Sequence, residues 1–288
     1  MYTMTPAAFD YHRPGSIEEA LELLAADGET RALAGGHSLL PAMKLRVATP
    51  SALVDLGGIA GLDGIAREGD AVVIGALATH ASVASSEVVR EACPVLAEAA
   101  GMIGDRQVRN RGTIGGSIAH ADPSADYPTV TTALGATIVT ASRSGGRELT
   151  ADECFVDVFT TALEPGELIT SVRVPATPAG TGAAYLKHSH PASRYAVIGV
   201  AAVVGVEGGS CSRARVVVGG ATAAPVAVPV DELVGSEPSA EAIGAAAAHV
   251  REAIGSPFGD TYASAEYRLH LAEVMTRRAL SAAVARAG

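Results

Sequence analysis

The chain has 288 residues and a formal net charge of −10, and 48% of its residues are hydrophobic. This length suits two domains of ordinary size. The acidic balance, with no basic cluster to offset it, disfavours binding to nucleic acids or anionic membranes. Because the chain has no Trp and only 4% aromatic residues, its cores must consist mainly of Ala, Val, Leu and Ile.

The N-terminus lacks a basic segment followed by an apolar run, so no signal peptide is predicted and we expect a cytoplasmic protein. The longest apolar run, residues 196–206, is too short to span a bilayer and reads as a strand buried on both faces. Membrane insertion is therefore not expected. The three cysteines, Cys93, Cys154 and Cys211, are far apart and form no C-x-x-C pair. We expect neither an iron–sulfur cluster nor a bound metal in this chain.

The first part of the chain predicts a compact α/β lobe. Ser16 and Glu19 have the spacing of a capping box, which starts a helix with one apolar face. A short strand over 31–34 leads directly into a glycine pair at 35–36. A turn or short helix over 39–46 and a strand over 52–55 complete a lobe that ends near residue 59.

A second lobe follows from about residue 60. Its apolar runs predict strands over 71–75, 137–140 and 168–174. Residues 85–100 have a helical pattern, with Pro94 placed to start a helical turn. The segment 175–180 has the Pro- and Gly-rich composition of a linker, so we place a domain boundary after residue 177.

The C-terminal part predicts a small α+β domain. Strands are expected over 183–187, 196–206 and 214–218, followed by a connection broken by prolines over 226–238. Two helices are expected over 239–254 and 263–286. Three strands followed by two helices indicate a three-stranded antiparallel sheet covered by helices.

Two stretches share a pattern in which apolar residues lead into a glycine pair followed closely by serine. They are Ala34-Gly35-Gly36-His37-Ser38 and Thr113-Ile114-Gly115-Gly116-Ser117. Glycine has no Cβ and tolerates positive φ, so backbone N–H groups at such a pair can converge on an anion. Neither stretch has the Rossmann or the P-loop spacing. Two such turns suit the two anionic groups of a diphosphate.

Further motifs surround the glycine pairs. They are Pro6-x-x-Phe9-x-Tyr11-x-Arg13-Pro14, Arg109-Asn-Arg111, His120-Ala-Asp-Pro-Ser-Ala-Asp126-Tyr-Pro128, Thr161-Ala-Leu-Glu-Pro-Gly-Glu167 and Tyr185-Leu-Lys187. With these motifs the chain resembles, over nearly its whole length, the FAD-binding medium subunit of the molybdenum hydroxylases. These are the relatives of carbon monoxide dehydrogenase and xanthine dehydrogenase.

The resemblance implies a fold, a cofactor and partners. The fold is α+β, with a two-lobed FAD-binding domain of the vanillyl-alcohol-oxidase/PCMH type over 1–177 (lobes about 1–59 and 60–177) and a C-terminal domain of the carbon monoxide dehydrogenase flavoprotein type over 178–288. The cofactor is FAD. The implied partners are a [2Fe–2S] small subunit, which passes electrons to the flavin, and a molybdopterin large subunit, which hydroxylates the substrate.

The resemblance also assigns residues to the FAD site. The first glycine stretch would serve one phosphate and the second stretch the other, through backbone amides. The cofactor-binding residues implied are Leu33, Ala34, Gly35, Gly36, His37, Ser38, Leu39, Ile103, Gly104, Arg109, Thr113, Gly115, Gly116, Ser117, Ala125, Asp126, Leu168 and Lys187.

Several side chains admit two interpretations. Asp126 would accept a hydrogen bond from a ribose or ribityl hydroxyl, or it caps a helix before Pro128; Asp122 is the better candidate for a cap. Lys187 would lie beside the flavin ring and tune its potential, or it is an exposed strand lysine. At His37, the amide is expected to matter more than the ring.

The remaining polar groups leave further alternatives. Arg106, Arg109 and Arg111 would neutralise the diphosphate, or they form ion pairs with Asp105 or Asp122. His188 and His190 are expected to face solvent, since no third metal ligand lies nearby in sequence. Tyr195 stands where many family members have an acidic residue, and it would either stack near the flavin or anchor the following strand.

Three functions remain for comparison. The first is a FAD-binding electron-transfer subunit of a molybdenum-containing hydroxylase complex. The second is a free-standing FAD-dependent oxidoreductase of the same fold, which would need acid or base residues facing the flavin. The third is a structural subunit that has lost its flavin, which two intact glycine stretches argue against.

Overall fold

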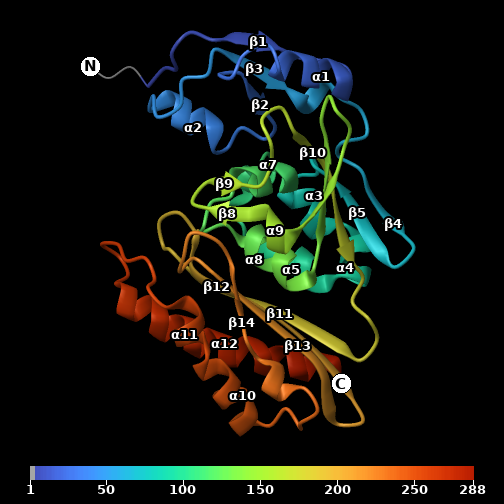
Figure 1. The fold of residues 1–288 in the computed structure, drawn as a ribbon, viewed down its shortest axis with the longest axis vertical. Coiled ribbons are helices and arrows are strands. Elements are labelled where there is room, and N and C mark those ends of the chain that lie inside the picture. Colours follow the sequence, from blue (N-terminus) through green and yellow to red (C-terminus); the bar gives the residue numbers. More distant parts are fainter. Residues whose placement is uncertain (1–3) are drawn as a thin grey trace.

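The computed structural model describes residues 4–288, and its elements form three bodies stacked along the long axis of the molecule (Figure 1). The first body carries a parallel sheet in the order β1-β3-β2, with α1 beside it. Ser16 caps α1 by accepting from the Glu19 N–H at 3.2 Å, and the Glu19 carboxylate accepts from the N–H of Gly15. The elements are β1 (Asp10–His12), α1 (Ile17–Leu24), β2 (Arg31–Leu33), α2 (Leu39–Lys44), β3 (Ala52–Asp55) and η1 (Leu56–Gly58).

The second body is an antiparallel sheet in the order β4-β5-β10-β6-β7, with short helices packed around it. The strands of this sheet are β4 (Ile65–Glu68), β5 (Ala71–Gly75), β6 (Thr137–Ala141), β7 (Glu148–Thr150) and β10 (Leu168–Pro175). A separate two-stranded sheet is formed by β8 (Phe155–Asp157) and β9 (Thr160–Thr161). The helices are α3 (His80–Ser85), α4 (Glu87–Ala92), α5 (Pro94–Met102), α6 (Arg106–Arg109), α7 (Ile114–His120), α8 (Asp126–Leu134) and α9 (Ala151–Cys154).

The helix expected over 85–100 is wrong as a single element. It is divided between α4 and α5 at Cys93, whose φ of −148° is not helical, and Pro94 begins the next helix. Proline has no N–H to continue the helical ladder, but it suits a first helical position.

The third body is an antiparallel sheet in the order β11-β12-β13-β14, with helices on one face (Figure 1). The expected three strands are present, and a fourth, β14, lies in the segment predicted as an irregular connection. The elements are β11 (Thr181–Ser189), β12 (Ala196–Glu207), β13 (Ser210–Gly219), β14 (Val226–Val228), η2 (Asp231–Leu233), α10 (Ala240–Ala248), α11 (Val250–Ile254) and α12 (Ala265–Ala287).

The two faces of this C-terminal sheet belong to different cores. Val200 and Ala202 point into a cluster shared with α10 and α12. Tyr185, Ala201 and Val203 point the other way, into the core of the second body. Alternate residues of β12 are thus buried on opposite faces, which explains its unbroken apolar sequence. The mixed α+β class is confirmed, while the domain division after residue 177 stays a prediction.

Among residues 4–288, none of the helices combines the length and apolar character needed to cross a bilayer.

Candidate functional site

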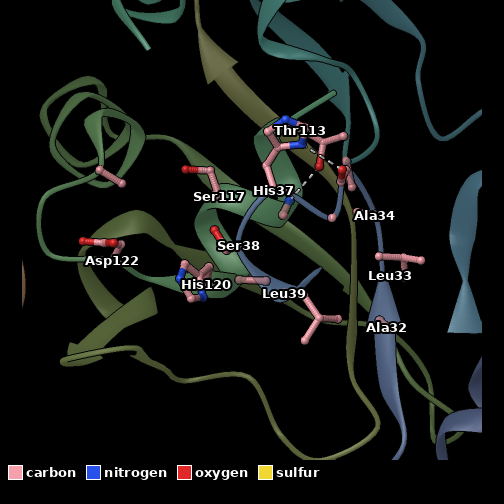
Figure 2. A pocket seen from close by; sticks show the side chains of 18 of the residues that line it. Ala32, Leu33, Ala34, His37, Ser38, Leu39, Thr113, Ser117, His120 and Asp122 are labelled. Carbon is pink, nitrogen blue, oxygen red and sulfur yellow. Dashed lines mark hydrogen bonds between the residues drawn. The ribbon is translucent and has the colours of Figure 1, made fainter. Parts of the chain in front are cut away.

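A cavity of about 640 Å³ lies where the three bodies meet. The segments that line it include the loop after β2, the first residue of α3, the turn between α5 and α6, the start of α7 and the loop after it, the start of β10, and the loop before β12. Figure 2 shows Ser38 and His37 of the loop after β2 close to Ser117 of α7 and to Thr113, the N-cap residue of that helix. A volume in this range suits an organic cofactor.

The first glycine stretch leaves its amides free. No acceptor in residues 4–288 takes the backbone N–H groups of residues 35–39, although all of these residues line the cavity. Gly36 has a φ of +73°, which turns the chain sharply at this point. Successive unpaired N–H groups in such a turn form a positive concavity for an anion.

The two glycine stretches touch each other. A Cβ on Gly35 would lie 2.1 Å from the carbonyl oxygen of Arg111, and one on Gly116 would lie 3.6 Å from the Cβ of Ala34. Only a residue without a side chain permits the first of these approaches. The structure therefore brings together two stretches that lie far apart in the sequence.

The second stretch is not a turn of free amides, as its sequence suggested, but the first turn of α7. The N–H groups of residues 114–117 are all used. Ala78 O accepts from Ile114 at 3.0 Å and Ala76 O from Gly115 at 2.9 Å, while Thr113 Oγ1 accepts from Gly116 at 3.1 Å and Thr113 O from Ser117 at 3.0 Å. A Cβ on Gly115 would lie 2.5 Å from the Cβ of Ala76. This glycine permits close packing onto the strand end rather than anion binding.

Most residues assigned to the FAD site line the cavity, and two do not. The lining residues among them are Leu33, Ala34, Gly35, Gly36, His37, Ser38, Leu39, Ile103, Gly104, Thr113, Gly115, Gly116, Ser117, Ala125, Asp126 and Leu168, and Tyr195 joins them. The two that do not are Arg109 and Lys187, which bond to residues next to or in the lining. Arg109 Nη1 donates to the carbonyls of Ile103 and Gly104 at 3.1 and 3.2 Å.

Lys187 is neither exposed nor free. Its side chain is 1% exposed, and its ammonium lies 2.8 Å from Asp126 Oδ1, 3.0 Å from Asp126 Oδ2 and 3.0 Å from the carbonyl of Met102. The Tyr185 hydroxyl donates to Asp126 Oδ1 at 2.7 Å. Burial next to Asp126 raises the pKa of Tyr185 well above its ordinary value, so this hydroxyl keeps its proton. The interpretation of Lys187 as an exposed strand lysine is wrong.

The capping roles considered for the two aspartates are wrong as well. The N-cap of α8 is Ala125, with Asp126 one position inside the helix. Asp122 closes a turn by accepting from the Ser124 N–H at 2.9 Å. Neither aspartate caps a helix with its side chain, so the Asp126 carboxylate at the cavity wall serves Lys187 and Tyr185.

The arginine ion pairs are also wrong. In residues 4–288, no carboxylate lies within 4.0 Å of Arg106, Arg109 or Arg111, because Asp105 instead caps α6 by accepting from the Val108 N–H at 2.9 Å. These cations therefore remain without anionic partners near the turn between α5 and α6.

The structure places His37, His190 and Tyr195 in three different surroundings. His37 Nδ1 lies 3.3 Å from Gly35 O, so its ring contacts its own loop. His190 packs on the ring of Tyr262, with centroids 4.6 Å apart, and is only half-exposed. Tyr195 is 41% exposed at the cavity mouth, and crowding by neighbouring atoms followed by the charge of Asp122 raises its pKa.

Among the cavity residues to which the sequence assigned no role are His80 and Glu167. His80 is 5% exposed and packs on Tyr127 with ring centroids 5.3 Å apart. Glu167 accepts from Thr140 Oγ1 at 2.6 Å and from Arg147 Nε and Nη2 at 2.8 Å each. These bonds fix the loop that leads into β10 at Leu168. Glu167 ends the motif over 161–167, so the sequence offered a signal for it. His80 follows Thr79 in no recognisable motif, so the sequence offered none for it.

Comparison with known proteins agrees with this geometry. Residues 7–177 match the model of the FAD binding domain in molybdopterin dehydrogenase, and residues 183–283 match the CO dehydrogenase flavoprotein C-terminal domain. The carbon monoxide dehydrogenase medium chain of Afipia carboxidovorans is 42% identical over 99% of both chains. The 6-hydroxypseudooxynicotine dehydrogenase complex subunit alpha of Paenarthrobacter nicotinovorans is 41% identical over 99% of this chain and 97% of that one.

A solved structure is similarly close. A carbon monoxide dehydrogenase from Hydrogenophaga pseudoflava that lacks the Mo-pyranopterin moiety of its molybdenum cofactor superposes with a TM-score of 0.94 at 42% identity, over 98% of this chain and 99% of that one. The chain therefore belongs to the family of FAD-binding subunits of molybdopterin dehydrogenases, which are oxidoreductases with FAD as their cofactor.

Proposed function

We propose that this chain is the electron-transfer subunit of a molybdenum-containing hydroxylase complex. It would accept electrons from the [2Fe–2S] clusters of a small subunit and pass them to an external acceptor, while a molybdopterin large subunit oxidises the substrate. Full-length similarity to subunits named as parts of dehydrogenases supports this role. Among residues 4–288, no group of three His, Cys, Asp or Glu side chains is placed to hold a metal ion.

The observation that carries the proposal is the row of unpaired amides at residues 35–39 on the wall of a cavity of about 640 Å³. These donors fit the diphosphate of FAD, with the hydroxyls of Ser38 and Ser117 nearby. When bound, FAD supplies a redox centre that accepts and releases electrons.

The rest of the wall suits a flat, partly apolar cofactor. Leu33, Ile103 and Leu168 offer apolar contact. Gly116 and Ala125 have small side chains or none, so they leave room for the cofactor. Asp126 retains acceptor capacity beside its bonds to Lys187 and Tyr185, which fits a cofactor hydroxyl.

We propose an indirect role for two of the assigned cations. Lys187 and Arg109 would position the cofactor by holding Met102 O, Ile103 O and Gly104 O in place. Tyr195 would cover the exposed edge of the cofactor at the cavity mouth. The division into a FAD-binding domain over 1–177 and a C-terminal domain over 178–288 remains part of this proposal.

The test begins with the native complex. The purified chain should be yellow, release FAD rather than FMN on denaturation, and copurify with cluster-bearing and molybdopterin subunits. In stopped-flow experiments the flavin should be reduced only after the clusters. A colourless chain that binds no added FAD would contradict the proposal. Turnover of a small substrate by the chain alone would favour the free-standing oxidoreductase.

A further inference from the structure

His80 occupies an unusual place in the wall of the cavity. It is the first residue of α3 and only 5% exposed, yet it lines the same cavity as the free amides. Its Nδ1 is buried with no hydrogen-bond partner in the part of the chain that the structure describes. Buried polar atoms are nearly always paired, so an unpaired nitrogen in a ring that lines a cavity marks a side chain whose protonation can respond to what binds there.

The ring is held rigidly. It packs on Tyr127 on one side, and on another it lies so close to Gly112 that a Cβ there would be 2.5 Å from His80 Nε2. The backbone N–H of His80 also donates to Gly112 O at 2.9 Å. The segment 111–112 in turn touches Gly35. His80 is therefore fixed directly behind the contact between the two glycine stretches.

The charges around His80 are all of one sign. The titratable groups that face it are His37 from the loop after β2, Arg109 from α6, and the neutral phenol of Tyr127 from α8. No carboxylate in residues 4–288 forms an ion pair with His37, His80 or Arg109. Burial first, and then the charges of His37 and Arg109, lower the pKa of His80 to about 4. The imidazole is thus neutral until an anion enters.

We propose that His80 takes up one proton from solvent when the diphosphate of FAD binds, and that the imidazolium then serves as an electrostatic partner of that dianion. The proposal rests on the proposed function, since it requires FAD at this cavity. Two negative charges held at the amides of residues 35–39, in the same cavity, would oppose the unfavourable field of His37 and Arg109. The proton goes to the imidazole, so one of the two added negative charges is balanced within the chain.

Proton uptake makes the affinity for FAD depend on pH. Because the His80 pKa would be higher in the bound state than in the free state, FAD binds more tightly as the pH falls. Below the bound-state pKa, the affinity should rise by up to about tenfold per pH unit until the free-state value near 4 is approached.

The test is calorimetric titration with FAD of the full-length chain, alone or in its complex, after the FAD has been removed. Titrations at pH 6 in two buffers of different ionisation enthalpy give the number of protons taken up. The wild type should take up roughly one half to one proton. His80→Gln should bind FAD with almost no uptake. His249→Gln, which changes a half-exposed histidine beside Glu232 outside the cavity lining, should behave like the wild type. Riboflavin, which lacks the diphosphate, should cause no uptake.

Several results would overturn the inference. These are FAD binding without proton uptake, uptake that persists in His80→Gln, or uptake that disappears in His37→Gln instead. Failure of the chain to bind FAD at all would overturn the proposed function as well, which separates the two failures. If His80→Gln does not fold, nuclear magnetic resonance of the eight histidines in the wild type decides the question. Without FAD, one histidine ring should have a pKa below 5. When FAD binds, the pKa of the same ring should rise above 5.

Discussion

The two glycine stretches share a sequence pattern but do different work. At residues 35–38 the glycines form an open turn whose amides have no partner in residues 4–288. At residues 115–116 they lie inside α7, where the amides bond to Ala76 and Thr113. The first pair leaves backbone amides free to bind an anion. The second pair allows Ala76 to pack closely against α7.

The difference arises from what precedes each pair. The first follows a strand, β2, and the chain must turn before α2 can begin. The second follows Thr113, a good N-cap, whose hydroxyl accepts from the Gly116 N–H and draws the segment into a helix. A short motif therefore specifies small residues, while its neighbours decide whether the backbone is available for binding.

The largest effect is expected for Gly35→Ala. The new Cβ would meet Arg111 O at 2.1 Å, so the turn at Gly35 and its free amides must move away from the segment that precedes α7. We expect FAD affinity to fall by about 10- to 100-fold, as a strain of roughly 1–3 kcal/mol implies. Fluorescence titration with FAD measures this. Gly28→Ala, in the same lobe with no atom within 4 Å of its Cβ position, is the control and should bind normally. Equal affinity in both variants would contradict the contact.

The second pair contains its own control. Gly115→Ala places a Cβ 2.5 Å from Ala76 Cβ and 2.7 Å from Ala76 O, so we expect a loss of about 1–3 kcal/mol of stability. Gly116→Ala meets only the side-chain oxygen of Thr113 within 3 Å, and replacing a helical glycine recovers up to about 1 kcal/mol. Thermal unfolding should separate the two variants clearly. A similar melting temperature for both would show that the strand contact is unimportant.

The loop that leads into β10 at Leu168 offers a comparison outside both glycine stretches. Hydrogen bonds from Arg147 lower the pKa of Glu167 from 4.5 to about 2. A depressed carboxyl pKa stabilises the fold above the unfolded value and loses this effect as the pH falls through about 2. The wild type should therefore lose about 1–2 kcal/mol more stability than Glu167→Gln between pH 5 and pH 2, after allowance for solvent around Arg147.

Denaturant unfolding at several pH values measures this loss. The matched control is Glu148→Gln, which breaks a pair with Arg173 whose side chains are both about half-exposed. It should change the pH profile little, because exposed pairs contribute little. Identical profiles for Glu167→Gln and the wild type would mean that the loop is held by other contacts.

The smallest effect is expected for Thr113→Val. Removing the hydroxyl leaves the Gly116 N–H without its acceptor, which costs about 0.5–2 kcal/mol of stability. FAD affinity should change by less than about threefold, because the amides of α7 are not the donors to the diphosphate in our proposal. A large loss of FAD affinity at full stability would show that the second stretch binds the cofactor as directly as the first.

Much of the fold could be predicted from local pattern. The strand over 196–206, the capping box at Ser16 and the final helix were visible because their apolar spacing or caps are contained in the sequence. The helix α8 escaped because its residues, including Thr129 and Thr131, are buried on all sides and show no amphipathic period. The break at Cys93 was also hidden, since Pro94 marks either a start or an interruption.

Many residues that line the cavity could be predicted from the sequence. The hydrogen bonds that position those residues could not. Gly35 and Gly36 are marked by their backbone freedom alone. The partners of Lys187 could not be inferred, because Met102 lies 85 residues away and offers a carbonyl that every residue has. The unpaired nitrogen of His80 likewise depends on the packing of Tyr127 and Gly112, which no sequence spacing encodes.

The bond network of Lys187 limits how this protein can be divided. The family models place a seam between residues 177 and 183, yet Lys187 and Tyr185 cross it to reach Asp126. A fragment that ends at residue 177 would expose Asp126 without Lys187, its counterion. It would also expose the apolar side chains that β11 and β12 cover in the whole chain. Shuffling such modules between relatives would therefore succeed only when the aspartate, the tyrosine and the lysine are exchanged as a set.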